Sequence, residues 1–290
     1  MFFPAVRTLL LQLDTSPQPS VFDRVVAYDA GADEVMSYGG VDADTVRDLV
    51  HGCIFTRGPK DLKNTAIFIG GSNVSTGEQL LAKVRSTFFG PMQVSVLMDS
   101  NGSNTTAAAA VLAARKHLPL SNTIALVLGG TGPVGHRAAQ LLAMEGADVR
   151  VGTRSLEKAR QTCDAIVKVV SNAKVSPTET SSSAGLEEAS EGVSLIIAAG
   201  AAGVELLSAE HRQAIRTLKV AVDLNAVPPL GLGGLNVMDK ATERDGIHCY
   251  GAIGVGGTKM KIHKAAIARL FESNDQVLDT AAIYAIGQSL

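Results

Sequence analysis

The feature that most constrains the fold is a glycine-rich turn between an entirely apolar stretch and an amphipathic one. The apolar stretch is 124–128, and the glycines that follow it have the spacing GxGxxG. In a βαβ unit the first glycine permits a tight turn, the second brings the backbone close to a pyrophosphate, and the third lets helix and strand pack closely. The helix then offers N–H groups to the phosphates. We therefore predict a dinucleotide site whose contacts are Gly130, Thr131, Gly132, Pro133, Val134 and Gly135.

The rest of the chain alternates short apolar runs with helical stretches, which is typical of parallel α/β sheets. We expect strands at 8–13, 34–38, 65–69, 94–98, 123–128, 148–151, 195–198 and 220–222. Helices are expected at 20–30, 43–50, 74–88, 104–117, 136–146, 155–172, 258–271 and 278–286. The Ser-rich stretch 178–185 reads as a surface loop.

A chain of 290 residues favours about two domains. The predicted fold class is α/β, with an α/β substrate domain and a Rossmann-type, doubly wound dinucleotide-binding domain. The substrate domain would consist of 1–103 and 260–290, and the dinucleotide-binding domain of 104–259. We expect the functional site in a cleft between the two domains.

Composition excludes several classes of protein. The net charge is −2 and no basic run is present, which argues against nucleic-acid binding. No apolar run reaches the roughly 18–20 residues of a membrane span, and the apolar start reads as a first strand rather than a signal peptide. Cys53, Cys163 and Cys249 lie far apart without metal-binding spacing, so we expect free thiols, no metal and a cytoplasmic location.

The end of the strand after the glycine turn indicates which dinucleotide binds. NAD-binding sites place a carboxylate there for the ribose 2′-hydroxyl, whereas this chain has Arg154 between Thr153 and Ser155. The guanidinium offers a cationic fork to a 2′-phosphate, and Lys158 could assist. The alternative is that Arg154 is simply a solvated surface residue. We predict NADP.

Two later strand ends continue this site. Ala199 and Gly200 follow one strand and would let the nicotinamide lie on the backbone, and Asn225 follows the next and could bond the carboxamide. Ordinary tight turns are the alternative at both.

The polar segment 99–106 lies between an apolar strand and an Ala-rich helix. We interpret it as facing substrate, and the alternative is a capping and hinge segment. The predicted substrate-binding residues are Asn101, Ser103, Asn104 and Thr105.

A second glycine-rich segment, 254–257, leads into Lys259. We expect this lysine at a helix start, where the helix dipole disfavours a cation, and the exception suggests a use such as bonding a substrate heteroatom. His263 is a lone histidine and is more simply structural.

Taken together, these motifs resemble the bacterial NADP-dependent methylene-tetrahydromethanopterin dehydrogenases, which also act on methylene-tetrahydrofolate. The resemblance covers nearly the whole chain and is most specific in DSNGSNTTAAA, GGTGPVG, VGTRSLEKA and GVGGTKMKIHKA. It implies hydride transfer from the methylene bridge of a reduced pterin to NADP in one-carbon metabolism, and a homo-oligomer. It also implies that Lys259 is the active-site lysine and that Arg154 accounts for the NADP preference.

The chemistry of this reaction gives roles to two residues. Loss of hydride leaves a delocalised cation, which the carboxylate of Asp99 would stabilise. Lys259 would anchor the pterin through a hydrogen bond, or be neutral in a dry pocket. The competing hypotheses are a shikimate-type NADP dehydrogenase and a non-catalytic sensor or binding protein for NADPH or reduced pterins.

Overall fold

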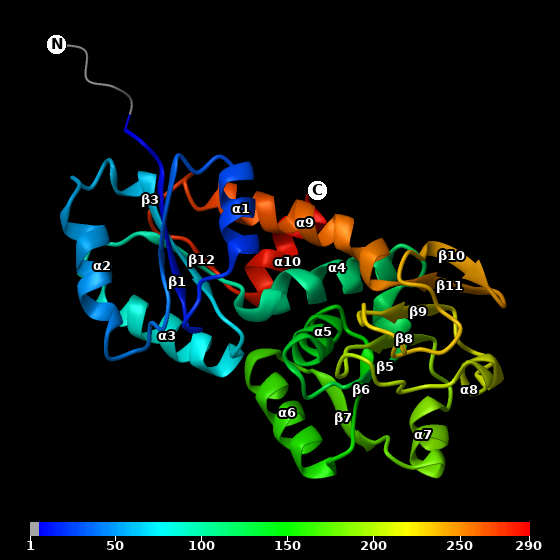
Figure 1. Ribbon diagram of the computed structural model, residues 1–290. Coiled ribbons are helices and arrows are strands. Elements are labelled where there is room, and N and C mark those ends of the chain that lie inside the picture. The colour runs from blue at the N-terminus through cyan, green and yellow to red at the C-terminus, as the bar shows by residue number, and fades with distance from the viewer. Residues whose placement is uncertain (1–5) are drawn as a thin grey trace. The chain divides into compact units, whose positions relative to one another are not determined.

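The computed structural model describes residues 6–290 and confirms an α/β fold with two parallel-sheet units (Figure 1). Unit 1 comprises the described residues up to Thr105 together with Met260–Leu290, and unit 2 is Thr106–Lys259. Residues 1–5 belong to the apolar start expected to lead into the first strand, and they lie outside the described residues.

Unit 1 is built on a five-stranded, wholly parallel sheet in the order β12-β4-β3-β1-β2. Its strands are β1 (Leu9–Asp14), β2 (Glu34–Tyr38), β3 (Thr65–Gly70), β4 (Ser95–Met98) and β12 (Val277–Leu278). Its helices are α1 (Val21–Asp29), α2 (Val46–Phe55), α3 (Val74–Thr87), the first residues of α4 (Ser103–Arg115), the last part of α9 (Ala252–Arg269), and α10 (Thr280–Gln288).

Helices cover both faces of this sheet. On one face, α2 and α3 enclose a core that includes Leu11, Ile67 and Val96. Helices α1, α9 and α10 lie on the other side of the strands in Figure 1. The helix starts are fixed locally, because the Ser20 side chain accepts from the Asp23 N–H at α1 and Asp279 accepts from two N–H groups of α10.

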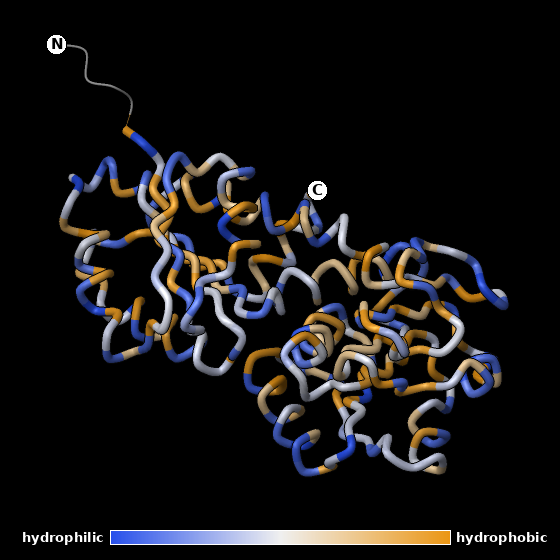
Figure 2. The backbone as a smooth tube through the Cα atoms, in the orientation of Figure 1, coloured by the Kyte–Doolittle hydropathy of each residue, from blue (hydrophilic) through white to orange (hydrophobic). Residues whose placement is uncertain are grey.

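Unit 2 has a seven-stranded sheet in the order β10-β11-β9-β8-β5-β6-β7, in which only β10 runs antiparallel to its neighbour. The strands are β5 (Ile124–Leu128), β6 (Asp148–Thr153), β7 (Lys174–Glu179), β8 (Leu195–Ala198), β9 (Val220–Asp223), β10 (Lys240–Arg244) and β11 (Ile247–Tyr250). The remaining helices are α5 (Pro133–Met144), α6 (Leu156–Val169), α7 (Ser183–Ser190) and α8 (Ala209–Ala214). The central strands of this sheet consist mainly of buried apolar residues, as the hydropathy colours in Figure 2 indicate.

The expected elements differ from the observed ones in several places, and α8 is among the elements that were not predicted. The loop predicted at 178–185 is wrong, because this stretch holds the end of β7 and the start of α7. The hairpin of β10 and β11 and the short strand β12 were not predicted. Helix α9 begins at Ala252, six residues before the predicted 258, so its glycines lie inside the helix.

Within residues 6–290, no helix combines the length and the apolar character that crossing a membrane requires.

Candidate active site

The glycine turn of unit 2 is packed so closely that side chains have no room. A Cβ on Gly130 would lie 2.8 Å from Val151 Cγ1, and a Cβ on Gly135 would overlap the carbonyl oxygen of Gly129. The turn is held by the Gly130 N–H, which donates to the Gly152 carbonyl at 3.0 Å. The turn therefore offers bare backbone to a ligand, as a pyrophosphate-binding turn requires.

This turn lies at the point where the chain changes direction across the sheet. β5 has β6 on one side and β8 on the other, and a ligand crevice of a doubly wound sheet forms at such a switch point. Gly129 has a φ of 71°, and a Cβ on it would lie 2.6 Å from Gly200 Cα. The ends of β5 and β8 therefore meet through Gly129 and Gly200. Gly129 was not among the predicted site residues, and its signal in the sequence was the pair of adjacent glycines, Gly129 and Gly130.

Helix α5 begins within the turn and presents its N-terminus there. Gly132 is its N-cap residue and makes no side-chain capping bond, and Pro133 occupies the first helical position. The N–H groups of the first turn are thus not satisfied by a capping side chain, and the helix dipole adds partial positive charge. An anionic group can be bound at this position.

The predicted 2′-phosphate residues lie at the end of β6 and the start of α6. Thr131 and Thr153 place their hydroxyl oxygens 3.4 Å apart, and the Ser155 side chain caps α6 by accepting from the Lys158 N–H. Arg154 and Lys158 are both exposed. Lys158 lines a groove of about 350 Å³, whereas Arg154 does not. The lining residues are Thr131, His136, Lys158, Gln161, Thr162 and Ala165, without a carboxylate.

The loop after β9 is organised around a buried carboxylate that the sequence analysis missed. Asp223 accepts from the Asn225 N–H at 2.9 Å and the Leu232 N–H at 2.8 Å. Burial raises the pKa of Asp223 above its usual range, although bonds from backbone N–H groups act in the opposite direction. Its signal in the sequence was an aspartate that ends an apolar strand.

The side chain of Asn225 is committed to its own loop. Its Oδ1 accepts from the Val227 N–H at 3.0 Å, and its Nδ2 donates to the Pro229 carbonyl at 3.2 Å. These bonds favour the tight-turn alternative for Asn225, and contact with a carboxamide stays a prediction. Ala199 stays close to β5, because its N–H donates to the Leu128 carbonyl at 2.9 Å.

In unit 1 the polar segment after β4 closes around Asp99. The Asp99 carboxylate, which is buried, accepts from the N–H groups of Asn104 and Thr105 and from the Thr105 hydroxyl at 2.6 Å. Asp99 therefore caps the start of α4, which agrees with the alternative interpretation of this segment as a capping segment. Its carboxylate also lies at the carboxyl end of the parallel strands, where α/β sheets bind ligands.

The other predicted substrate residues differ in exposure. Asn104 is buried and bonds to the Met98 carbonyl and to the Thr280 hydroxyl, so it fixes the loop to the C-terminal segment. Asn101 is exposed and has a φ of 57°, a left-handed conformation that asparagine tolerates. Ser103 is buried, and its hydroxyl has no hydrogen-bond partner among residues 6–290. Asn101 is thus the most accessible of the four.

The prediction that Lys259 lies at a helix start is wrong, because it is the eighth residue of α9. The helix starts earlier since Gly251 and Gly254 pack against the backbone of 236–239, where a Cβ on either would overlap a carbonyl oxygen. The dipole argument for a use of Lys259 therefore fails. His263, one turn further, is buried and stacks on Phe68 with ring centroids 5.7 Å apart, which agrees with a structural role.

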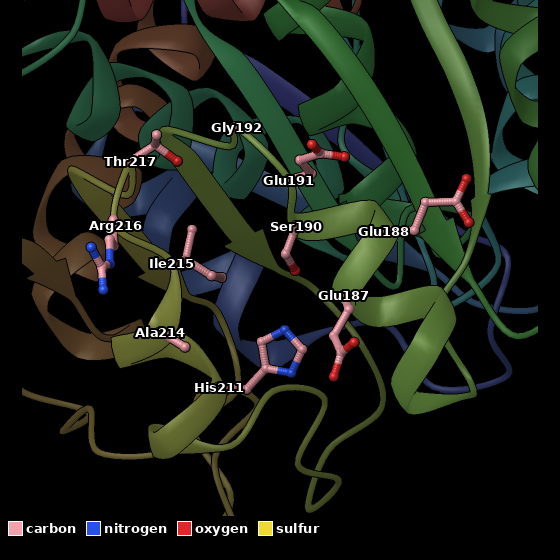
Figure 3. Close-up of a pocket in the computed structure, with 10 residues that line it drawn as sticks. All are labelled: Glu187, Glu188, Ser190, Glu191, Gly192, His211, Ala214, Ile215, Arg216 and Thr217. Carbon is pink, nitrogen blue, oxygen red and sulfur yellow. The ribbon is translucent and has the colours of Figure 1, made fainter.

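A second hollow in unit 2, of about 550 Å³, lies between the ends of α7 and α8 (Figure 3). Gly192 and Thr217 line it just before β8 and β9 begin, so it is at the amino edge of the sheet, opposite the glycine turn. Glu187, Glu188 and Glu191 also line it. Three carboxylates make it unsuited to an anionic dinucleotide.

The fold and the glycine turn define a two-unit α/β protein with a turn of the dinucleotide-binding type. A solved structure of shikimate 5-dehydrogenase from Listeria monocytogenes, in complex with shikimate and NAD, is similar in fold. It has a TM-score of 0.55 and 13% identity, and the match covers 98% of this chain and 97% of that one.

Sequence comparison identifies the family. The family model described as methylene-tetrahydromethanopterin dehydrogenase, N-terminal, matches residues 21–101. The chain is 45% identical to the bifunctional protein MdtA of Methylorubrum extorquens over 98% of this chain and 99% of that protein. It is 32% identical to the NAD(P)-dependent methylenetetrahydromethanopterin dehydrogenase of the same organism, over 93% of each. The chain belongs to the methylene-tetrahydromethanopterin dehydrogenase family.

Proposed function

We propose that the protein oxidises methylene-tetrahydromethanopterin to the methenyl form by transferring a hydride to NADP, and that methylene-tetrahydrofolate is a second substrate. The observation that carries the proposal is the bare glycine turn at the switch point of unit 2, in a chain 45% identical to a relative over almost its full length. A shikimate-type reaction is not favoured, because that likeness is one of fold at 13% identity.

The residues of unit 2 fit a dinucleotide. Gly130, Gly132 and Gly135 pack against neighbouring atoms of the turn and leave its backbone bare of side chains, and the start of α5 offers N–H groups to a pyrophosphate. Bound there, NADP would supply the hydride acceptor. The preference for NADP over NAD rests on Arg154 and Lys158, two exposed cations at the end of β6 where NAD-binding proteins place a carboxylate.

The reaction requires no general acid or base from the protein, because a hydride leaves the methylene carbon and no proton is transferred. The residues of the chain therefore have to orient the two rings, exclude water and tolerate a developing positive charge. We assign charge stabilisation to Asp99, which is held in place by three hydrogen-bond donors. We assign Asn101, Ser103, Asn104, Thr105 and Lys259 to holding the pterin.

We also propose a cellular location, an oligomeric state and a set of partners for the enzyme. We propose a cytoplasmic homo-oligomer that binds neither nucleic acid nor membranes. The near-neutral charge supports the absence of nucleic-acid binding, and the free cysteines support the cytoplasmic location. Sedimentation of the purified protein tests the oligomeric state.

An anaerobic assay of the purified protein tests the reaction. NADP reduction is followed at 340 nm with methylene-tetrahydromethanopterin and with methylene-tetrahydrofolate, and NAD and shikimate serve as controls. Turnover with a pterin and NADP is the expected result, and the ratio of kcat/KM values identifies the preferred carrier. Intact NADP binding without turnover of either pterin would overturn the proposal in favour of a sensor.

A further inference from the structure

A hollow of about 500 Å³ lies in unit 1 between α2 and the strands β1, β2 and β3. Leu9 and Leu11 from β1, Met36 from β2 and Leu49 from α2 contribute apolar side chains to its wall. A volume of this size is typical of sites that hold a small organic molecule.

This hollow is separate from the predicted pterin residues of the same unit. Leu9 opens β1 and Thr65 opens β3, so the hollow reaches the amino edge of the parallel sheet. Asp99 follows the carboxyl end of β4. A molecule bound in the hollow would therefore leave the polar segment after β4 free.

Gly52 keeps the hollow open. It lies in the middle of α2 and lines the hollow, and a Cβ built on it would meet no atom within 4 Å. Neither a left-handed backbone nor a crowded neighbour requires glycine at this position. A glycine inside a helix nevertheless lowers the stability of the helix relative to alanine. The protein without a ligand is therefore less stable than it would be with alanine at position 52.

The floor of the hollow holds a polar group whose hydrogen bond is missing. Thr65 lines the hollow with 2% of its surface exposed, on the same face of β3 as the core residues Ile67 and Ile69. Its hydroxyl oxygen has no hydrogen-bond partner within the described chain. Buried hydroxyl groups are normally bonded, so this one is available to a ligand.

The charged residues at the hollow do not call for a charged ligand. The two terminal nitrogens of Arg57 donate to the backbone carbonyls of Asn64 and Arg7, at 2.7 and 2.9 Å. Asp48 is exposed to solvent. The Cys53 thiol is neutral, because burial raises its pKa to about 12.

From these contacts we infer that the hollow is a binding site for a neutral, compact and mainly apolar molecule that carries one hydrogen-bonding group directed at Thr65. A flat ring system with a single ring N–H or hydroxyl meets these conditions. The inference does not depend on the proposed reaction.

Isothermal titration of the full-length protein with indole tests the inference. Benzothiophene serves as the matched probe, since it has the same shape without the N–H donor. We expect indole to bind in the hollow with a Kd below about 1 mM, and benzothiophene to bind about tenfold more weakly. Absence of saturable indole binding, or equal affinity for the two probes, would overturn the inference.

Two pairs of variants locate the site. Gly52→Phe fills the hollow and should abolish indole binding, whereas Gly52→Ala should retain it. Thr65→Val keeps the shape but deletes the unbonded hydroxyl, so it should raise the melting temperature and weaken indole binding to the level of benzothiophene. A thermal unfolding curve followed by circular dichroism, measured on each variant, reports whether the chain has folded. Unchanged indole binding by a folded Gly52→Phe variant would place the ligand elsewhere.

Discussion

The variant Gly135→Ala tests whether the crowding of the glycine turn, rather than its flexibility, makes the dinucleotide site. The added Cβ would overlap the Gly129 carbonyl oxygen and lie 2.9 Å from Gly130 Cα. Both neighbours are backbone atoms of the turn, so no side chain can rotate away. The turn itself has to shift, and it is the part of unit 2 that we assign to the pyrophosphate.

Two opposing effects set the size of the change. Replacing glycine by alanine in a helix contributes about 1 kcal/mol of stability, whereas overpacking costs about 1–3 kcal/mol. The net loss is therefore up to about 2 kcal/mol, which lowers the melting temperature by up to roughly 8 °C. Losing one charge-assisted bond to phosphate costs about 1.5–3 kcal/mol, so the Kd for NADP should rise at least about tenfold.

The assay is a fluorescence titration with NADPH, paired with urea unfolding. Gly52→Ala is the matched control, because its Cβ would meet no atom within 4 Å. This control should gain about 1 kcal/mol and bind NADPH as the parent protein does. An unchanged Kd for NADPH in Gly135→Ala would refute the reasoning.

Four further substitutions test the assigned roles. Arg154→Ala should raise the Kd for NADP about tenfold or more and leave NAD binding unchanged, since only NADP carries the 2′-phosphate, and equal losses would count against the assignment. Lys259→Met should lower kcat while NADP titrations show unchanged affinity, and a fully active variant would rule out the role. Asp99→Asn keeps one oxygen acceptor for the α4 N–H groups but removes the charge and the acceptor of the Thr105 hydroxyl, so kcat should fall along with some thermal stability, and an unchanged kcat would refute charge stabilisation. Burial raises the pKa of Asp223, so its contribution to stability is present below pH 4 and is lost as the pH rises through the folded-state pKa. Urea unfolding across this range should show less decline for Asp223→Asn than for the parent, and parallel curves would contradict this.

The dinucleotide site could be predicted from the sequence because its determinants are local. The turn, the strand before it and the helix after it occupy one continuous segment, and close packing of backbone requires glycine at fixed positions. Helix α9 was predicted to start late because three glycines lower helix propensity. Packing of Gly251 and Gly254 against 236–239 outweighs that propensity, and no local pattern reveals such a contact.

Edge strands account for most of what the sequence did not reveal. No residue of β7 or β10 is fully buried, so neither strand carries the apolar run of a buried parallel strand. The role of Asp99 as a cap was one of two open alternatives, since the same polar residues can bond a helix end or a ligand. Only the hydrogen bonds that Asp99 accepts from the N–H groups of Asn104 and Thr105 show that it caps the helix.

The strand order of unit 1 has a consequence for synthesis of the chain on the ribosome. β12 pairs with β4, and the Ser95 hydroxyl bonds to the Ser273 carbonyl across 178 positions of sequence. Unit 2 is contiguous and can complete its sheet as it emerges, whereas β4 keeps an open edge until β12 arrives. At about 5–20 residues per second this interval is on the order of 10–40 s. The nascent chain thus exposes a strand edge prone to mispairing during that time, and a chaperone that shields sheet edges would act then.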